Sequence, residues 1–212
     1  MYPHMIVWRA IQQTKVNWVI KTLILADLII LSASQLFGPI FAIFIENKIN
    51  GDVLEIVGVA AAIYLFSRSI VEIPVGIFVD RTSSEKDDLF TTVVGIVVMA
   101  CVYFLYTLID SVWQLYALQA LLGIGTALAW PGWYSIFTRH IDKTKEAFEW
   151  SLYDVVVGIG MAATAVIGSM IVKSFGFDWV FYLASVFTLL GALALLPLKA
   201  KLFSQHRHTN QL

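Results

Sequence analysis

Residues 75–88 read Val-Gly-Ile-Phe-Val-Asp-Arg-Thr-Ser-Ser-Glu-Lys-Asp-Asp, so a long apolar run ends abruptly in a cluster of opposite charges. A second apolar run begins at Leu89. Both runs are too long and too apolar for the amphipathic elements of a water-soluble core. We therefore interpret residues 75–88 as the short loop of a helical hairpin that crosses a membrane.

The composition of the whole chain supports a membrane protein. Of its 212 residues, 59% are hydrophobic and 14% are charged, whereas soluble domains have about 45–50% apolar and about 25% charged residues. The net charge of −1 gives no reason to expect a nucleic-acid partner. No nucleotide-binding loop, catalytic dyad or zinc-ligand spacing is present, and the pair His206 and His208 is a weak metal signal. We predict neither an enzyme nor a cofactor or metal site.

Six apolar stretches are each long enough to supply the ~20 residues that a helix needs to cross the hydrocarbon core. They cover residues 22–45, 55–79, 89–109, 112–138, 149–172 and 178–198. Isolated strands cannot satisfy their backbone in lipid, and no stretch alternates like a barrel strand. The sequence therefore predicts an all-α integral membrane protein. Its six-helix transmembrane domain is expected at 22–198, after an interfacial N-terminal segment at 1–21 and before a polar tail at 199–212.

The distribution of Lys and Arg predicts the orientation in the membrane. Eleven of these residues fall on the side of the N-terminus, and two, Lys48 and Lys173, fall on the other side. The eleven are Arg9, Lys15, Lys21, Arg81, Lys86, Arg139, Lys143, Lys145, Lys199, Lys201 and Arg207. Because cytoplasmic loops carry the excess of basic residues, we predict a multi-pass protein of the plasma (inner) membrane. Both termini and the 75–88 loop are expected to be cytoplasmic.

The hairpin loop resembles the loop between helices 2 and 3 of the major facilitator superfamily of transporters. Gly76, Asp80, Arg81 and Lys86 match the family motif, whereas Ser83 replaces its glycine and the next two positions lack the usual basic residues. The resemblance implies that the loop lies between two halves of a transporter and governs the switch between inward-open and outward-open states. The alternative is a plain charged turn that anchors two helices.

The resemblance also implies an architecture, because transporters of this family contain two six-helix halves, each built of two inverted three-helix repeats. The six spans would form one such half, with spans 1–3 and 4–6 as the repeats. One half has no second wall for a central cavity, so we expect a parallel homodimer or a second six-helix half as partner. A truncated remnant and a non-transporting membrane scaffold or assembly protein are the alternatives. Gln119 stands where many proton-coupled members carry an arginine, and the transported solute is not predicted.

Ionisable residues inside the spans are the first candidates for a functional role, because each is costly in lipid unless it is paired or hydrated. Asp27 lies in span 1, and Arg68 and Glu72 lie one helical turn apart in span 2. If spans 1 and 2 pack side by side, two carboxylates share one arginine, and their protonation can follow the conformation. The three residues are candidates for binding substrate or a coupling proton. A static buried ion-pair cluster is one alternative, and snorkelling of Arg68 and Glu72 is the other.

Polar and aromatic positions on spans 1 and 4 extend this candidate site. Asp27 and Ser34 fall within one narrow arc of span 1, and one stripe of span 4 carries Gln119, Thr126, Trp130 and Trp133. Pro131 is expected to interrupt span 4. In the family, helices 1 and 4 line the central cavity, so the resemblance makes the two tryptophans candidate walls for a substrate. Aromatic residues at helical spacing also serve as ordinary packing.

An ion pair near the cytoplasmic surface is expected between spans 4 and 5. Asp154 lies about a turn inside span 5, and Arg139 ends span 4. We predict that they pair as a structural clasp at the inner gate, with Glu146 and Glu149 as competing partners.

Overall fold

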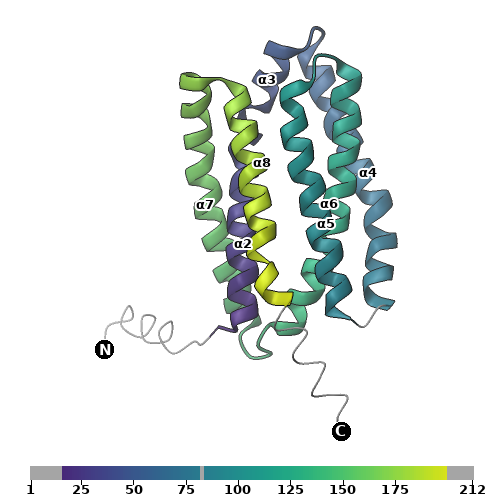
Figure 1. Cartoon of the computed structure of the whole chain (residues 1–212), viewed down its shortest axis with the longest axis vertical. Helices are drawn as coiled ribbons and strands as arrows, with labels where there is room; N and C mark the ends of the chain where they lie inside the picture. Colours follow the sequence, from purple (N-terminus) through teal and green to yellow (C-terminus); the bar gives the residue numbers. More distant parts are fainter. Residues whose placement is uncertain (1–15, 82–83, 200–212) are drawn as a thin grey trace, which may run out of the picture.

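The computed structural model describes residues 16–81 and 84–199, which form a bundle of long helices (Figure 1). The first span consists of α2 (Trp18–Gln35), the short 3-10 turn η1 (Gly38–Ile40) and α3 (Phe41–Lys48). The next two are α4 (Val53–Arg81) and α5 (Glu85–Leu105), the latter extended by η2 (Tyr106–Leu108). The last three are α6 (Val112–His140), α7 (Glu146–Phe175) and α8 (Phe177–Ala194).

Six membrane spans are confirmed among the described residues, each with a helical segment long and apolar enough to cross a membrane. Most of their ends extend one to four residues beyond the predicted apolar stretches, because charged and polar residues continue the helices at headgroup depth. The first span begins at Trp18, inside the segment expected to be interfacial. Residues 1–15 and 200–212 of the two expected terminal segments lie outside the described residues.

Prolines act differently in the first and fourth spans. Pro39 lies in η1, where the first span breaks between α2 and α3. The predicted interruption at Pro131 is wrong, because α6 continues from Val112 through Pro131 to His140. A proline costs a membrane helix one backbone hydrogen bond, and neighbouring helices and side chains can satisfy the carbonyl that it frees.

The helices pack in a pattern that relates α2, α4 and α5 to α6, α7 and α8. The second helix of each set packs mainly against the first helix of the other, α4 on α6 and α7 on α2. The third helix of each set also packs against the first helix of the other set, α5 on α6 and α8 on α2. The two third helices, α5 and α8, pack against each other as well. This exchange fits two three-helix repeats arranged as one half of a major facilitator transporter. Figure 1 shows the result: α7 and α4 lie at opposite edges of the bundle.

Glycines allow the closest helix contacts. At Gly95 of α5 a Cβ atom would overlap the backbone of Gly125 and Ala129, and at Gly132 of α6 it would overlap the carbonyl oxygen of Asp88. Small residues at membrane helix interfaces permit this approach of backbones. The backbones of α5 and α6 are therefore in direct contact over more than one turn, along a line that we call the α5–α6 seam.

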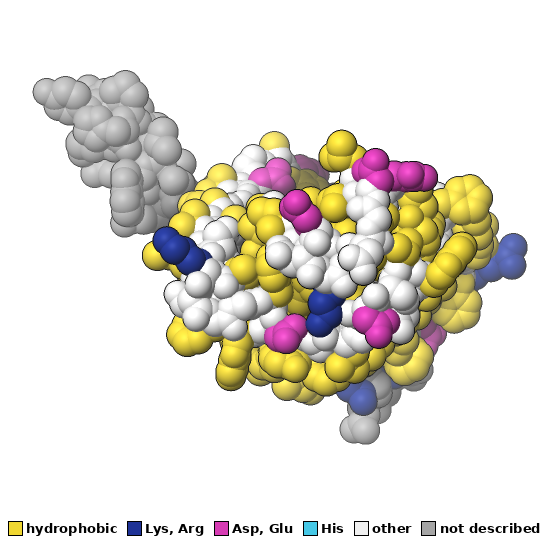
Figure 2. Space-filling model, turned by 90° about the horizontal axis from the view of Figure 1, so that it is seen from above, with side chains coloured by type: hydrophobic (Ala, Val, Ile, Leu, Met, Phe, Trp, Pro, Cys, Tyr) yellow, Lys and Arg dark blue, Asp and Glu magenta, His cyan; other side chains and the backbone are white. Residues whose placement is uncertain are grey.

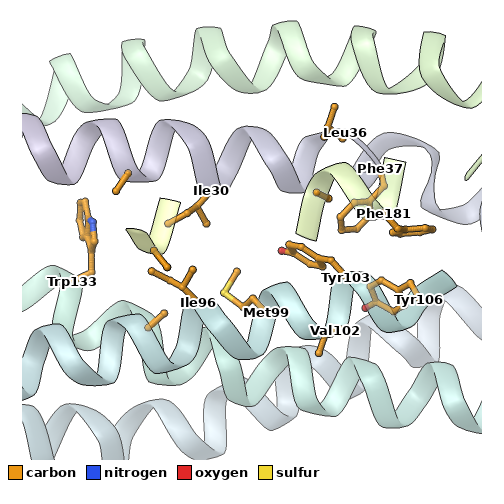
Figure 3. Packing of buried hydrophobic residues seen from close by; sticks show 14 of the residues in the cluster. Ile30, Leu36, Phe37, Ile96, Met99, Val102, Tyr103, Tyr106, Trp133 and Phe181 are labelled. Carbon is orange, nitrogen blue, oxygen red and sulfur yellow. The ribbon is translucent and has the colours of Figure 1, made fainter. Parts of the chain in front are cut away.

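Large side chains fill the middle of the bundle between α2, α5 and α8 (Figure 3). Toward the α3 end, Phe37 packs edge-to-face on Tyr103 with ring centroids 5.0 Å apart, and Phe181 lies at the same centroid distance from Phe37. Toward the other end, Ile30, Ile96 and Trp133 continue this packing. The core thus runs the length of the bundle and leaves polar groups in few places.

The two ends of the bundle differ in charge. The end at which α2 begins and α6 ends, here called the basic end, carries Arg81, Lys86, Arg139, Lys143 and Lys145. Figure 2 looks onto the opposite end, where acidic side chains gather inside a girdle of apolar ones. An apolar girdle between two polar ends is the surface expected of a bundle that spans a bilayer.

Candidate functional site

Asp27 is the most deeply enclosed ionisable side chain near the middle of the bundle. Asp27 lies nine positions after Trp18, the first residue of α2. At 1.5 Å per residue, it is therefore about 14 Å from the basic end. Its side chain is buried, and the hydroxyl of Tyr153 on α7 donates a hydrogen bond to its Oδ2 over 3.1 Å. The contact joins the first helix of one repeat to the second helix of the other.

Apolar and aromatic groups enclose the rest of the Asp27 side chain. A small void of about 10 Å³ lies beside it, and Thr92, Trp130 and Trp133 contribute to its wall. This is about the smallest space that holds a water molecule. The indole Nε1 of Trp133 is buried without a hydrogen-bond partner among the described residues. A water in the void would have the polar neighbours that such a molecule requires.

The tryptophans belong to an aromatic cluster on α6 and α7. Trp133 stacks on Phe137 with ring centroids 4.8 Å apart, and it also contacts Tyr153 at 5.2 Å. Trp130 stacks on Tyr134, whose side chain is exposed. Trp133 is therefore a core residue that supports Tyr153, whereas Trp130 lies at the border between the core and the surface.

Arg68 and Glu72 form a bidentate pair along α4. Arg68 Nε lies 2.9 Å from one carboxylate oxygen of Glu72, and Arg68 Nη2 lies 3.1 Å from the other. Both side chains keep about a third of their surface exposed. The predicted sharing of this arginine with Asp27 is wrong, because α4 packs against α6 rather than α2 and the partner of Asp27 is Tyr153.

The remaining polar positions of spans 1 and 4 do not join this site. The hydroxyl of Ser34 donates to Leu31 O, and that of Thr126 donates to Leu122 O, so each bonds the backbone of its own helix. Gln119 is buried on α6, two turns farther from the basic end than Thr126. Of the predicted residues, Asp27, Trp130 and Trp133 line one void, and Ser34, Gln119 and Thr126 lie elsewhere.

The described part of the hairpin loop that carries the family motif (residues 75–88, here called the motif loop) presents an open surface at the basic end. Asp80 and Arg81 are exposed at the end of α4, and residues 82–83 lie outside the described range. A Cβ atom added at Gly76 would have no neighbour within 4 Å, so this glycine is not required for a contact between described residues. Beside it, Asp80, Tyr134 and Arg139 contribute to an open groove of about 440 Å³ between α4 and α6.

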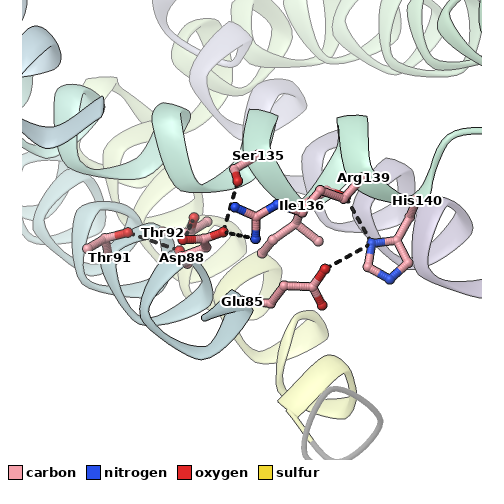
Figure 4. A network of polar contacts seen from close by, with 8 residues as sticks. All are labelled: Glu85, Asp88, Thr91, Thr92, Ser135, Ile136, Arg139 and His140. Atoms are coloured by element: carbon pink, nitrogen blue, oxygen red, sulfur yellow. Dashed lines mark hydrogen bonds and ion pairs between the residues drawn. The ribbon is translucent and has the colours of Figure 1, made fainter. Parts of the chain in front are cut away.

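A buried ion pair closes the α5–α6 seam near the same end (Figure 4). Asp88 is fully buried, and its Oδ2 accepts hydrogen bonds from Arg139 Nη1 at 3.0 Å and Ser135 Oγ at 2.9 Å. Thr92 of α5 bonds the carbonyl oxygen of Asp88 and, across the seam, that of Ala129. Arg139 therefore has its carboxylate partner on α5.

The predicted pair of Arg139 with Asp154 is consequently wrong. Asp154 is exposed on α7, which packs against α2, whereas the glycine contacts bring α5 close enough to α6 for Asp88 to reach Arg139. The sequence contained a signal for this pair, since Asp88 lies three residues after the start of its helix and directly precedes the apolar stretch that begins at Leu89. The same reasoning missed Tyr153, which is adjacent to Asp154 in sequence but turned by 100° toward α2.

Comparison with known proteins agrees with this architecture. The sequence model of the Major Facilitator Superfamily matches residues 23–211. The chain is 28% identical over 137 residues to the inner membrane transport protein YajR of Escherichia coli strain K12, an alignment that covers 64% of this chain. It spans 29% of that relative's own length. The family match, the six membrane spans and the exchanged packing of the two repeats lead to one conclusion: the chain belongs to the major facilitator superfamily.

Proposed function

We propose that this chain is one six-helix half of a secondary transporter that moves a small solute by alternating access, with Asp27 as the carrier of a coupling proton. The observation that carries the proposal is the burial of Asp27 between α2 and α7, bonded to Tyr153 and without a cation within ion-pair distance among the described residues. A lone ionised carboxylate in such a place costs several kcal/mol. Asp27 therefore carries its proton in this arrangement of the helices.

The position of the Asp27–Tyr153 contact links protonation to helix movement. The contact holds α7 to α2, and α7 is an edge helix that buries little of its apolar surface in the bundle. When α7 moves away from α2, Asp27 loses its partner and meets water, where the ionised form is favoured. Loss of the proton stabilises the open arrangement, and protonation stabilises the closed one. This is the differential stabilisation of two states that coupling requires.

The second wall of the transport path comes, in this proposal, from a second copy of the chain. The edge helices α4 and α7 leave apolar faces exposed, and α4 also exposes part of the Arg68–Glu72 pair. Charged groups are costly against lipid, so a protein or a water-filled path is the favoured neighbour of that pair. A parallel dimer with α4 and α7 at its interface forms the 12-helix arrangement of the family. The excess of basic residues supports a cytoplasmic position for the basic end, and we propose the plasma (inner) membrane as the location of the chain.

The test is proton movement in proteoliposomes that hold the purified chain and a pH-sensitive dye. A panel of sugars, amino acids, organic acids and organic cations is added outside, and solute-dependent acidification or alkalinisation is recorded. We expect at least one solute to move protons with the unaltered chain. Asp27→Asn, which keeps the shape of the side chain, is expected to abolish this signal.

Asp154→Asn is the matched control, because it removes an exposed carboxylate one position from Tyr153. It is expected to keep the signal. Solute uptake without proton movement would contradict proton coupling and leave transport intact. A folded protein that moves none of the panel, with or without a pH gradient, would favour the scaffold alternative.

A further inference from the structure

A second cavity lies away from the proposed transport site, between the start of α5 and the end of the sixth span. Its volume is about 330 Å³. Lys86 and Asp87 in the first turn of α5 contribute to one side, and Leu196 and Lys199 contribute to the other. Phe90 and Val93 continue the wall along α5, away from the basic end. The groove therefore has charged groups at its mouth and an apolar interior.

The charges are arranged for an anion at the membrane surface. Lys86 is the second residue of α5, and Lys199 is the last residue of the sixth span, so one ammonium group comes from each side of the groove. Asp87 contributes one negative charge, which leaves the mouth with a formal net charge of about +1. The apolar wall begins within one turn of these lysines. A free anion would use the lysines and leave this wall empty.

The groove also lies where lipid reaches the bundle. Phe90 is 69% exposed and Leu196 is 50% exposed, so the walls are open to the surroundings. In Figure 1, α5 and α8 lie between the edge helices α4 and α7, which we assign to the contact with a second copy. An occupant of this groove therefore does not compete with that contact.

We propose that the α5–α8 groove binds one anionic phospholipid, with its phosphate between Lys86 and Lys199 and an acyl chain along Phe90, Val93 and Leu196. Basic pockets between membrane helices recognise lipid headgroups by the same combination of charge and apolar contact. Because the groove includes the first turn of α5, directly after the motif loop, a bound lipid also holds the end of that loop.

The experiment is native mass spectrometry of the full chain with added phosphatidylglycerol, compared with phosphatidylcholine and with inorganic phosphate. We expect one phosphatidylglycerol bound above the statistical background, and much less phosphatidylcholine. Lys86→Gln combined with Lys199→Gln is expected to weaken phosphatidylglycerol binding about 25-fold, since each lysine near an anionic lipid contributes about fivefold. Val93→Trp fills the groove without a change of charge and is expected to abolish this binding.

The control is Lys21→Gln combined with Lys143→Gln, which removes two exposed lysines from the same end. It is expected to leave phosphatidylglycerol binding unchanged. An equal loss in the control would show general attraction to the basic end and overturn the proposal. Tight binding of inorganic phosphate would overturn the proposal in favour of a free-anion site. A change of oligomeric mass in Val93→Trp without loss of lipid would overturn it in favour of a protein contact.

Discussion

Glycines of the α5–α6 seam and glycines on the outward faces of the edge helices α4 and α7 have opposite surroundings. At Gly95 and Gly132 in the seam, an added Cβ atom would overlap the backbone of the facing helix. At Gly76 on α4 and Gly158 on α7, it would meet no atom within 4 Å. A glycine inside a helix costs roughly 1 kcal/mol relative to alanine. The fold of one copy accounts for that cost in the seam, and also at Gly160 and Gly168 of α7, which pack against α2, but it does not account for the cost at Gly76 and Gly158.

The contacts of the α5–α6 seam hold one copy of the chain together, whereas the exposed faces of α4 and α7 are the surfaces that a second copy would contact. Half of the most apolar segment of α5 is buried inside the bundle, compared with 11% for the corresponding segments of α4 and α7. The seam also contains the Asp88–Arg139 pair. Changes in the seam are therefore expected to destabilise the chain, and changes on the outward faces of α4 and α7 are expected to alter mainly its association and transport.

The largest loss of stability is expected from Gly132→Leu. Its side chain would meet the backbone oxygen of Asp88 and the hydroxyls of Thr91 and Thr92, so α5 and α6 must separate. Overpacking of this kind costs about 3 kcal/mol or more. Thermal unfolding of the detergent-purified protein measures the loss. Gly158→Leu on α7 is the matched control, and a similar loss there would contradict the distinction between seam and edge.

A smaller loss is expected from Arg139→Ala. It leaves the fully buried Asp88 carboxylate with Ser135 as its remaining side-chain partner. Because the arginine side chain is itself about a third exposed, the loss is expected to be about 2 kcal/mol, below that of a fully buried pair. Asp154→Ala should change stability by less than about 0.5 kcal/mol. The reverse order in chemical or thermal unfolding would restore Asp154 as the partner of Arg139.

Tyr153→Phe is expected to cost about 1 kcal/mol, the usual contribution of one hydrogen bond. The change removes the donor to Asp27 and keeps the ring that packs on Trp133. Its effect on transport is expected to exceed its effect on stability, because the hydrogen bond connects α2 to α7. Parallel measurements of thermal unfolding and proton movement check this. Loss of both in equal proportion would indicate a purely structural bond.

The smallest effect on one copy is expected from Gly76→Val, within about 0.5 kcal/mol. The new side chain points into open space beside the motif loop. In the proposed dimer the same side chain lies near the facing copy, so the dimer is expected to dissociate at a higher protein concentration than the unaltered chain. Sedimentation at several concentrations measures this change. Unaltered association would remove Gly76 from the interface.

The parts of this protein that local composition determines could be predicted from its sequence. Long apolar stretches can only be helices in lipid, and a rare charge such as Asp27 stands out in them. The partners of the charges depend on which helices touch, and hydropathy does not contain that information. Asp27 was therefore identified while Tyr153 was missed, and Arg139 was assigned to Asp154 instead of Asp88.

Glycine positions illustrate the same limit. Their spacing indicates a helix that can be approached closely, but it does not say by which neighbour. The structure assigns Gly123 to the contact with α4, since an added Cβ atom would lie 2.5 Å from Tyr64 O. Gly76, the glycine of the motif, has no such neighbour among the described residues. Only the packed bundle distinguishes these two positions.

The proposal that a second copy covers α4 and α7 is tested most directly by the oligomeric mass of the purified chain. Native mass spectrometry from nanodiscs or detergent, over a range of protein concentrations, gives this mass. We predict a dimer for the unaltered chain and a larger monomer fraction for Gly76→Val. A monomer at every concentration would contradict the homodimer and direct the search to a different six-helix partner.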